Sequence, residues 1–428
     1  MQSPFGEFCV CIILPKDCKL VLFLSDFKFA QFIVLYQKTT TTTKKTATTT
    51  KKATTSAAST TKATSTTKAT SATTTAAAMP KSLLPASLKV GYYSSWSAYS
   101  GFTPDKIQAS MLDVIHYAFA AIGTDGKIKA GDTAIDYTNF TKFKALKAQY
   151  PHLITLISIG GWNDSDRFSD VALTDVSRKT FAQSVVSFIR QYGFDGVDLD
   201  WEYPVSGTGG RAVDKTNFTL LMKVLRETLD AQAKVDRRYY YLTFAGGAAN
   251  WYLNNIELSK VSQYIDYALD MTYDLHGPWD TYADFNSPLY TPTESSPQYK
   301  ISVDSSIRAW LSAGIPKGKL VLGIPFYGYV YNGVKNTNNG LYQTFTSAKA
   351  VGYDSIISNY LNKSAYTKLT HSTAGVPYLF GNNTFISYDD AASVKKKAQY
   401  ARSQGLRGTA AWELSYDRSA VLLKAMAG

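Results

Sequence analysis

Residues 194–202 read FDGVDLDWE, and the alternation of side chains in these residues is the starting point for predicting the fold. Successive side chains of a β-strand leave opposite faces of a sheet. As a strand, the stretch places Asp198, Asp200 and Glu202 on one face and its apolar side chains on the other. The apolar face can be buried against other elements, whereas the acidic face needs a chemical explanation.

Seven more apolar, strand-like runs lie before and after this stretch, and helical stretches separate several of them. The eight candidate strands are residues 89–96, 114–122, 153–161, 194–202, 240–247, 264–274, 319–328 and 408–417. Strands that alternate with helices favour parallel pairing. We therefore expect an α/β protein in which eight units close into a (β/α)8 TIM barrel, with an open doubly wound sheet as the alternative.

Two of the intervening helices have recognisable ends. Ser177 is expected to cap the first of them, and Gly193 is expected to end it. Either Asp389 or Asp390 is expected to begin the second, and Gly405 to end it.

Composition separates the N-terminal part of the chain from the barrel. Residues 1–38 hold the three cysteines, match a secretory signal poorly and contain no membrane span of about 18 apolar residues, so this segment stays unassigned. Residues 39–80 are almost entirely Thr, Ala, Ser and Lys, which predicts a disordered linker. The barrel is expected over residues 88–426, with a short insertion at about 329–387 between strands seven and eight.

The positive charge of the chain does not indicate nucleic-acid binding. The formal net charge is +12, but the first 80 residues hold ten lysines and three acidic residues, which leaves about +5 for the rest. No cluster of Lys and Arg with interleaved aromatic residues follows residue 81. We therefore expect neither nucleic acid nor a membrane span.

Polar and aromatic residues collect where four of the predicted strands end, which is the face of a barrel that carries active sites. They are Ser158, Gly160, Gly161, Asp198, Asp200, Glu202, Met271, Tyr273, Asp274, Trp412 and Glu413. Three acids that point into a packed barrel cannot all ionise without cost, so at least one pKa is expected to rise. A carboxyl group that stays protonated near neutral pH can donate a proton.

Two other interpretations of the acids remain open at this point. They can form a hydrogen-bonded polar layer of the barrel, or they can bind a divalent cation. The chain has four histidines and no His-x-x-x-His pair, and it lacks phosphate-loop, dinucleotide and nucleophile-elbow motifs between a strand and a helix. We expect no metal and no cofactor.

The motifs resemble those of glycoside hydrolase family 18, the chitinases. DGVDLDWE at 195–202 is similar to the family signature Asp-x-x-Asp-x-Asp-x-Glu. Four further motifs occur in the same order as in the family: SIGG at 158–161 before the signature, and MTYD at 271–274, GIPFYG at 323–328 and AAWELS at 410–415 after it. The resemblance covers roughly residues 88–426.

This resemblance implies a retaining, substrate-assisted hydrolysis of β-1,4-linked N-acetylglucosamine, in chitin and chitooligosaccharides. Glu202 would protonate the glycosidic oxygen, while the acetamido carbonyl of the substrate attacks the anomeric carbon. Asp200 would accept a hydrogen bond from the acetamido N–H and share a proton with Asp198. Tyr273 would form a hydrogen bond with the acetamido oxygen. The four residues are the expected catalytic group.

The same resemblance implies a set of residues that bind the sugar. They are Tyr92, Phe119, Trp162, Met271, Asp274, Trp279 and Trp412. Trp162 and Trp279 are interpreted as stacking platforms, because sugar rings present flat C–H faces to aromatic rings. Trp96 and Trp310 are assigned to the core, and Asp195 to a structural role.

Two departures from the family pattern affect specificity. Tyr329 follows GIPFYG where family members commonly have Arg, and the insertion at 329–387 looks shorter than in processive members. We expect a shallower cleft and endo-type cutting. The alternatives are a chitin-binding, lectin-like relative and an endo-β-N-acetylglucosaminidase that acts on glycoprotein glycans.

We also expect a secreted monomer that carries N- and O-linked glycans. The sequons for N-glycosylation are at Asn139, Asn163, Asn217, Asn362 and Asn382.

Overall fold

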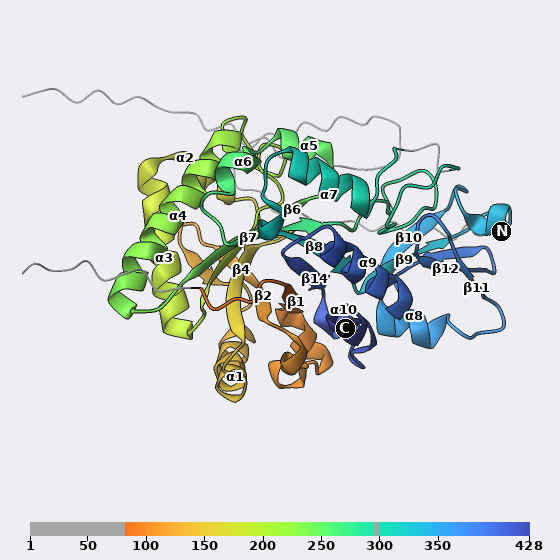
Figure 1. Cartoon of the computed structure of the whole chain (residues 1–428), viewed down its shortest axis with the longest axis horizontal. Coiled ribbons are helices and arrows are strands. Elements are labelled where there is room, and N and C mark those ends of the chain that lie inside the picture. The colour runs from red at the N-terminus through yellow and green to blue at the C-terminus, as the bar shows by residue number, and fades with distance from the viewer. Residues whose placement is uncertain (1–81, 295–298) are drawn as a thin grey trace, which may run out of the picture. The chain divides into compact units, whose positions relative to one another are not determined.

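A computed structural model describes residues 82–294 and 299–428, so the predictions for 1–38 and 39–80 lie outside the described residues. Eight parallel strands form a barrel that closes because β1 pairs with both β14 and β2 (Figure 1). Around the barrel they are β1 (Leu88–Ser94), β2 (Val114–Ile122), β4 (Ile154–Gly160), β5 (Gly196–Asp200), β6 (Tyr241–Gly247), β7 (Tyr267–Met271), β8 (Leu320–Pro325) and β14 (Gly408–Trp412). All eight predicted strands and the (β/α)8 barrel are confirmed.

The alternation in β5 separates the core from the site as predicted. Val197 and Leu199 are fully buried in the apolar layer between the barrel and its helices. Trp201 packs in the same layer, with its ring stacked 5.4 Å from that of Phe168. The acidic side chains of β5 point the other way, into the barrel.

Helices surround the barrel in chain order (Figure 1). They are α1 (Asp136–Gln149), α2 (Phe168–Leu173), α3 (Asp175–Tyr192), α4 (Asp214–Asp236), α5 (Asn250–Asn254), α6 (Leu258–Val261), α7 (Val303–Ser312), α9 (Ala391–Ser403) and α10 (Val421–Ala427). Short 3-10 turns lie between several of these elements, and β3 (Ile128–Ala130) pairs antiparallel with β2. Within the described residues, none of these helices has the length and apolarity that crossing a bilayer requires.

The helix ends correct one prediction. The N-cap of α3 is Thr174, whose hydroxyl accepts the Ser177 N–H at 3.0 Å, while Ser177 Oγ reaches back to the Thr174 N–H. Ser177 is therefore the third helical residue of a capping box and not the cap, because Thr174 offers the same chemistry one turn earlier. Gly193 ends the helix in the left-handed conformation, as predicted.

A second, antiparallel sheet begins directly after β8. Its strands are β9 (Tyr327–Asn332), β10 (Ser347–Gly352), β11 (Thr367–Thr370), β12 (Pro377–Gly381) and β13 (Thr384–Ser387), in the order β10-β9-β13-β12-β11. The helix α8 (Tyr353–Asn359) follows β10, and Figure 1 shows these elements in blue beside the barrel. Asp390 then caps α9, which returns the chain to β14.

Asp195 lies just before β5 and holds the amino-terminal end of the barrel together. Its carboxylate contacts Lys147 Nζ at 2.6 Å, accepts the Thr155 N–H at 2.8 Å and pairs with Arg238. Asp195 thus lies at the other end of the strand from the site residues, which agrees with the structural role expected for it.

Leu199→Ala tests the predicted division of faces in β5. Deletion of this fully buried side chain should lower the free energy of unfolding by about 2–5 kcal/mol, because the close-packed layer cannot collapse into the cavity. Urea denaturation measures the change. The matched control is Leu220→Ala on α4, where the exposed side chain should contribute less than about 1 kcal/mol. Equal losses in the two variants would contradict the assignment of faces.

Candidate active site

The acidic row lies at the carboxyl end of β5, where the barrel opens. Asp198 and Asp200 are buried inside the barrel, and Glu202 lies two residues beyond the last strand residue and is half-buried. The Glu202 N–H donates to Ser165 Oγ at 2.9 Å, and that hydroxyl lies 3.0 Å from the Asp200 carbonyl oxygen. The loop after β4 therefore fixes the backbone that carries Glu202.

Asp198 is the charged member of the row. Hydroxyl groups of Tyr92, Ser158 and Thr243 donate to its carboxylate at 2.9, 2.8 and 2.6 Å, and His116 Nδ1 lies 3.1 Å from it. Burial alone would raise the pKa of Asp198, but His116 and the hydroxyl donors outweigh burial, and the pKa is lowered.

Asp200 is the protonated member. Burial, the nearby Glu202 and the ionised Asp198 together hold the pKa of Asp200 well above its usual range. Its Oδ1 is buried and has no hydrogen-bond partner among the described residues. A buried carboxyl oxygen without a partner is costly unless a ligand completes it.

Glu202 has the pKa that a proton donor near neutral pH requires. Burial raises the pKa of Glu202 to about 7, the Tyr203 hydroxyl lowers it, and the charge of Asp274 raises it. The row therefore contains three different carboxyl groups: Asp198 is charged, Asp200 is protonated, and Glu202 titrates near neutral pH.

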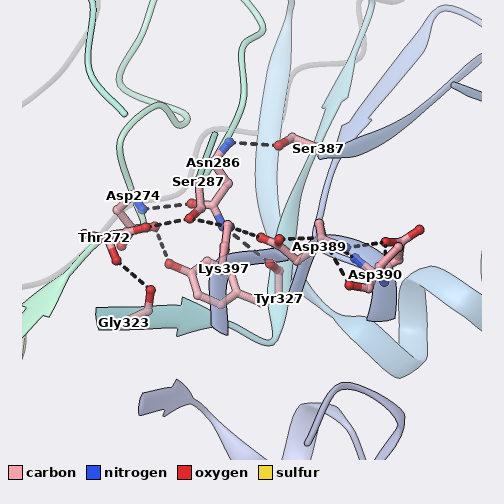
Figure 2. A network of polar contacts seen from close by, with 12 residues as sticks. Thr272, Asp274, Asn286, Ser287, Gly323, Tyr327, Ser387, Asp389, Asp390 and Lys397 are labelled. Atoms are coloured by element: carbon pink, nitrogen blue, oxygen red, sulfur yellow. Dashed lines mark hydrogen bonds and ion pairs between the residues drawn. The ribbon is translucent and has the colours of Figure 1, made fainter. Parts of the chain in front are cut away.

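Tyr273 and Asp274 face the row from the segment after β7. Asp274 has a positive φ of 53°, and its N–H donates to Asn286 Oδ1 at 2.8 Å. The hydroxyl groups of Tyr327 and Tyr329 both donate to its Oδ1 (Figure 2 draws Asp274, Asn286 and Tyr327). Although the residue reaches solvent at the rim, the protein packed around its carboxylate raises the pKa of Asp274, and the two hydroxyls lower it less strongly. Tyr329, the departure from the family pattern, thus contacts Asp274 with a neutral donor.

Aromatic rings line the rim on two sides of the acids. Phe119 lies at a register shift of β2, and its ring stacks 5.7 Å from that of Trp412. Trp96 lies 6.3 Å from Phe119 and is 45% exposed, so its assignment to the core was wrong; the loop after β1 carries it to the surface. Trp162 and Trp279 are 75% and 58% exposed.

The structure brings most of the predicted residues together, and two of the predicted sugar-binding residues are buried. Tyr92 is buried beneath the row, with its hydroxyl on Asp198, and Met271 is buried at the end of β7. Trp310 is buried, as predicted.

Two residues of the site, His116 and Thr243, were not predicted from the sequence. His116 shares the inward face of its strand with Ala118, so the alternation of side chains along that strand would have indicated that His116 points into the barrel. Across residues 82–294 and 299–428, no three acidic, His or Cys side chains are grouped so that they could hold a metal.

The raised pKa of Glu202 predicts a pH-dependent stability. In the unfolded chain a Glu titrates near 4.5, so the stabilising contribution of Glu202 is complete below that pH and is lost as the pH rises through about 7. Glu202→Gln should therefore exceed wild type in free energy of unfolding by about 2 kcal/mol at pH 8 and differ little at pH 4. Urea denaturation at the two pH values measures this difference.

The matched control for this prediction is Glu227→Gln, on the exposed face of α4. It should change the free energy of unfolding little at either pH. An equal stability of wild type and Glu202→Gln at pH 8 would show that Glu202 titrates like an exposed carboxyl group.

Comparison with known proteins agrees with this geometry. Residues 89–417 match the family described as glycosyl hydrolases family 18. Chitinase A1 of Niallia circulans is 41% identical over 398 residues, 78% of this chain and 57% of that protein, so the chain spans little more than half of its length. Chitotriosidase-1 of Mus musculus is 32% identical and covers 78% of this chain and 74% of its own.

Solved structures of the same family are also similar. A family 18 N-acetylglucosaminidase from Paenibacillus barengoltzii has a TM-score of 0.74 and 36% identity, and covers 80% of this chain and 99% of its own. The Group IV chitinase of Ostrinia furnacalis, solved with allosamidin, has a TM-score of 0.73 and 31% identity, and the alignment covers 79% of this chain and 97% of that one. The chain therefore belongs to glycoside hydrolase family 18.

Proposed function

We propose that the protein is a chitinase that hydrolyses β-1,4-linked N-acetylglucosamine polymers. The observation that carries the proposal is the buried Asp200 oxygen without a partner, next to a Glu202 that titrates near pH 7. One carboxyl group can then donate a proton and another can accept an amide N–H, which is the pair that an N-acetylated sugar requires. Two relatives named as chitinases support this substrate class.

The proposed reaction uses the substrate's own acetamido group as the nucleophile. Glu202 donates its proton to the glycosidic oxygen as the bond to the anomeric carbon breaks, and the acetamido carbonyl oxygen bonds to that carbon. Water then attacks the resulting oxazolinium ion and gives its proton to Glu202. The β-configuration is retained, and no covalent bond to the protein forms.

Asp200 and Tyr273 hold the acetamido group in this proposal. Asp200 Oδ1 accepts the acetamido N–H, and positive charge on the oxazolinium ion favours the ionised form of Asp200, whose proton passes to Asp198. Tyr273, buried at the barrel mouth, donates to the acetamido oxygen. The fixed geometry raises the effective concentration of the nucleophile.

The aromatic residues are proposed to bind successive sugars. Trp412 and Phe119 form a stacked pair that suits the floor under the sugar that reacts, with Met271 and Asp274 at its edge. Trp96 extends this surface on one side, and Trp162 and Trp279 offer exposed faces for further sugars. Tyr92 acts through Asp198, because its hydroxyl is already donated.

We propose endo-type cutting, in keeping with the exposure of Trp162 and Trp279. The likeness to an N-acetylglucosaminidase favours a second candidate, the release of single sugars from a chain end. A relative named endochitinase from Metarhizium robertsii, 29% identical, favours internal cutting.

We propose that the enzyme acts outside the cell as a monomer, because chitin is an external polymer. Residues 39–80 would link residues 1–38 to the barrel domain, and the lysines of the linker would favour an anionic wall. Three of the sequons, at Asn163, Asn362 and Asn382, lie on exposed turns, whereas Asn139 and Asn217 are buried within helices. N-glycans are therefore proposed at the three exposed asparagines.

Hydrolysis of an N-acetylglucosamine hexamer tests the mechanism. Wild type should release products that are initially β-anomers, read by NMR, and Glu202→Gln should lower kcat about 10²- to 10⁴-fold, because the glutamine amide cannot donate the proton that Glu202 supplies. Retained binding without hydrolysis by wild type would favour the lectin alternative. An initial α-anomer would contradict the retaining mechanism.

The product pattern separates the two modes of cutting. In the first minutes, internal cutting of the hexamer should give mainly dimer, trimer and tetramer, which chromatography resolves. Early accumulation of the monomer in step with the pentamer would overturn endo-type cutting and favour the N-acetylglucosaminidase candidate.

Trp279→Ala tests the proposed stacking platform. KM for the hexamer should rise about 5- to 20-fold with little change for the dimer, because a lost ring face contributes about 1–2 kcal/mol of sugar binding. Trp279→Phe keeps a ring and should recover most of the affinity. An equal rise for the dimer and the hexamer would place Trp279 at the subsites that the dimer already fills, and no rise for either substrate would place it outside the cleft.

A further inference from the structure

The segment that carries Tyr273 and Asp274 lies outside the hydrogen-bond ladder of the barrel. The pairing of β7 ends at Met271 on the β6 side and at Asp270 on the β8 side. The two residues that face Glu202 therefore do not take their orientation from the sheet. Other contacts must fix the peptide that precedes them.

Side chains from the long β7–α7 connection fix this segment from behind (Figure 2). Ser287 Oγ donates to the Thr272 carbonyl oxygen at 2.6 Å, and Thr272 Oγ1 donates to the Gly323 carbonyl oxygen at 2.6 Å. Asn286 Oδ1 accepts the Asp274 N–H at 2.8 Å. Both ends of the Thr272–Asp274 segment are thus held by neighbouring side chains.

A buried ion pair lies behind Ser287. Lys397 of α9 is fully buried, and its Nζ donates to Ser287 Oγ at 2.7 Å and to Asp389 Oδ2 at 2.7 Å. Figure 2 shows the chain of contacts from Asp389 through Lys397 and Ser287 to Thr272. A serine hydroxyl has a single proton, and an ammonium group can only donate. Because Lys397 occupies a lone pair of Ser287, the Ser287 proton is directed to Thr272.

Such an ion pair is a poor device for stability alone. Removal of two charges from water costs several kcal/mol per ion, and apolar replacements of similar volume are often equally stable. The contact to Ser287 gives Lys397 a use that an apolar side chain cannot supply, because it orders a hydroxyl group that holds the active-site segment.

We propose that Lys397 is a positioning residue, which acts through Ser287 on the Thr272–Tyr273 peptide and so sets Tyr273 and Asp274 against Glu202. The inference rests on the proposed chitinase function, because it assigns Tyr273 to the acetamido oxygen. Neither Lys397 nor Ser287 touches the substrate. A displacement of a reacting group by about 1 Å can cost about 10²-fold in rate, so the contact matters for turnover.

Two serine variants separate positioning from stability. Ser287→Ala removes the hydroxyl between Lys397 and Thr272 and leaves the ion pair in place. Ser393→Ala is the matched control, because Ser393 is equally buried and donates to the other oxygen of Asp389 at 2.7 Å, but it lies on α9, on the far side of the pair from Thr272. The control also removes one of the two reciprocal bonds of the α9 capping box, the Asp390 N–H to Ser393 Oγ bond, so it should lower the melting temperature by a similar amount.

The expected result is a difference in turnover without a difference in stability. With the hexamer as substrate, Ser287→Ala should lower kcat about 10- to 100-fold with KM within about threefold, whereas Ser393→Ala should keep kcat within about twofold. Calorimetry in the Glu202→Gln background should give a hexamer Kd for Ser287→Ala within about threefold of its parent.

Other outcomes overturn one proposal or the other. If both serine variants lose activity in proportion to their melting temperatures, or if neither loses it, the positioning role is wrong while the chitinase function stands. A wild type that does not cut the hexamer overturns the function instead.

A second variant covers the case in which Ser287→Ala does not fold. Lys397→Met with Asp389→Asn removes both charges together and frees the Ser287 hydroxyl to rotate, so it should lower kcat about 5- to 50-fold with KM within about threefold. A folded double variant with wild-type kcat would overturn the role of Lys397.

Discussion

Three carboxyl groups on one face of one strand cannot all be charged inside a barrel, and the rest of the site depends on how this conflict is resolved. Desolvation pushes the pKa values of Asp200 and Glu202 upward, and nearby carboxyl groups raise them further, with Asp274 acting on Glu202. Of the three, only Asp198 has a lowered pKa, because His116 on β2 and three hydroxyl groups on β1, β4 and β6 stabilise its charge. Burial keeps Asp200 protonated, and the nearby Glu202 and Asp198 add to this effect. The result is a graded row in which the outermost member, Glu202, titrates near neutrality.

The barrel fixes the inner and outer parts of the site in different ways. Asp198 and Asp200 belong to the parallel ladder, in register with β4 and β6, so backbone hydrogen bonds hold them. Glu202 and the Tyr273–Asp274 pair lie beyond the ends of their strands, where the ladder has stopped. Side-chain contacts replace it there: Ser165 holds the backbone of Glu202, and Asn286 that of Asp274. Precision at the mouth of the barrel therefore comes from loops and not from the sheet.

Some of those contacts come from outside the barrel strands. Tyr327 and Tyr329, at the start of the second sheet, hold the Asp274 carboxylate, and their hydroxyl groups lower the pKa of Asp274 without adding a positive charge. An arginine at position 329 would add one. Because the charge of Asp274 also raises the pKa of Glu202, the residue at 329 influences the proton donor from a distance. Specificity and acidity are in this way coupled to the β8–β14 insertion.

The strands, the closed barrel and the acidic row could be predicted from the sequence, because the alternation of side chains along a strand and the succession of strands and helices are local properties. The cap of α3 was misplaced, since Thr174 and Ser177 have the same capping chemistry three residues apart, and Trp96 was placed in the core. Which acid is charged could not be predicted from the sequence, because the partners of Asp198 come from strands 40 or more residues away. The same holds for Lys397, which meets Ser287 across 110 residues. Long-range partners set the pKa values and the orientation of the site, and no local pattern encodes them.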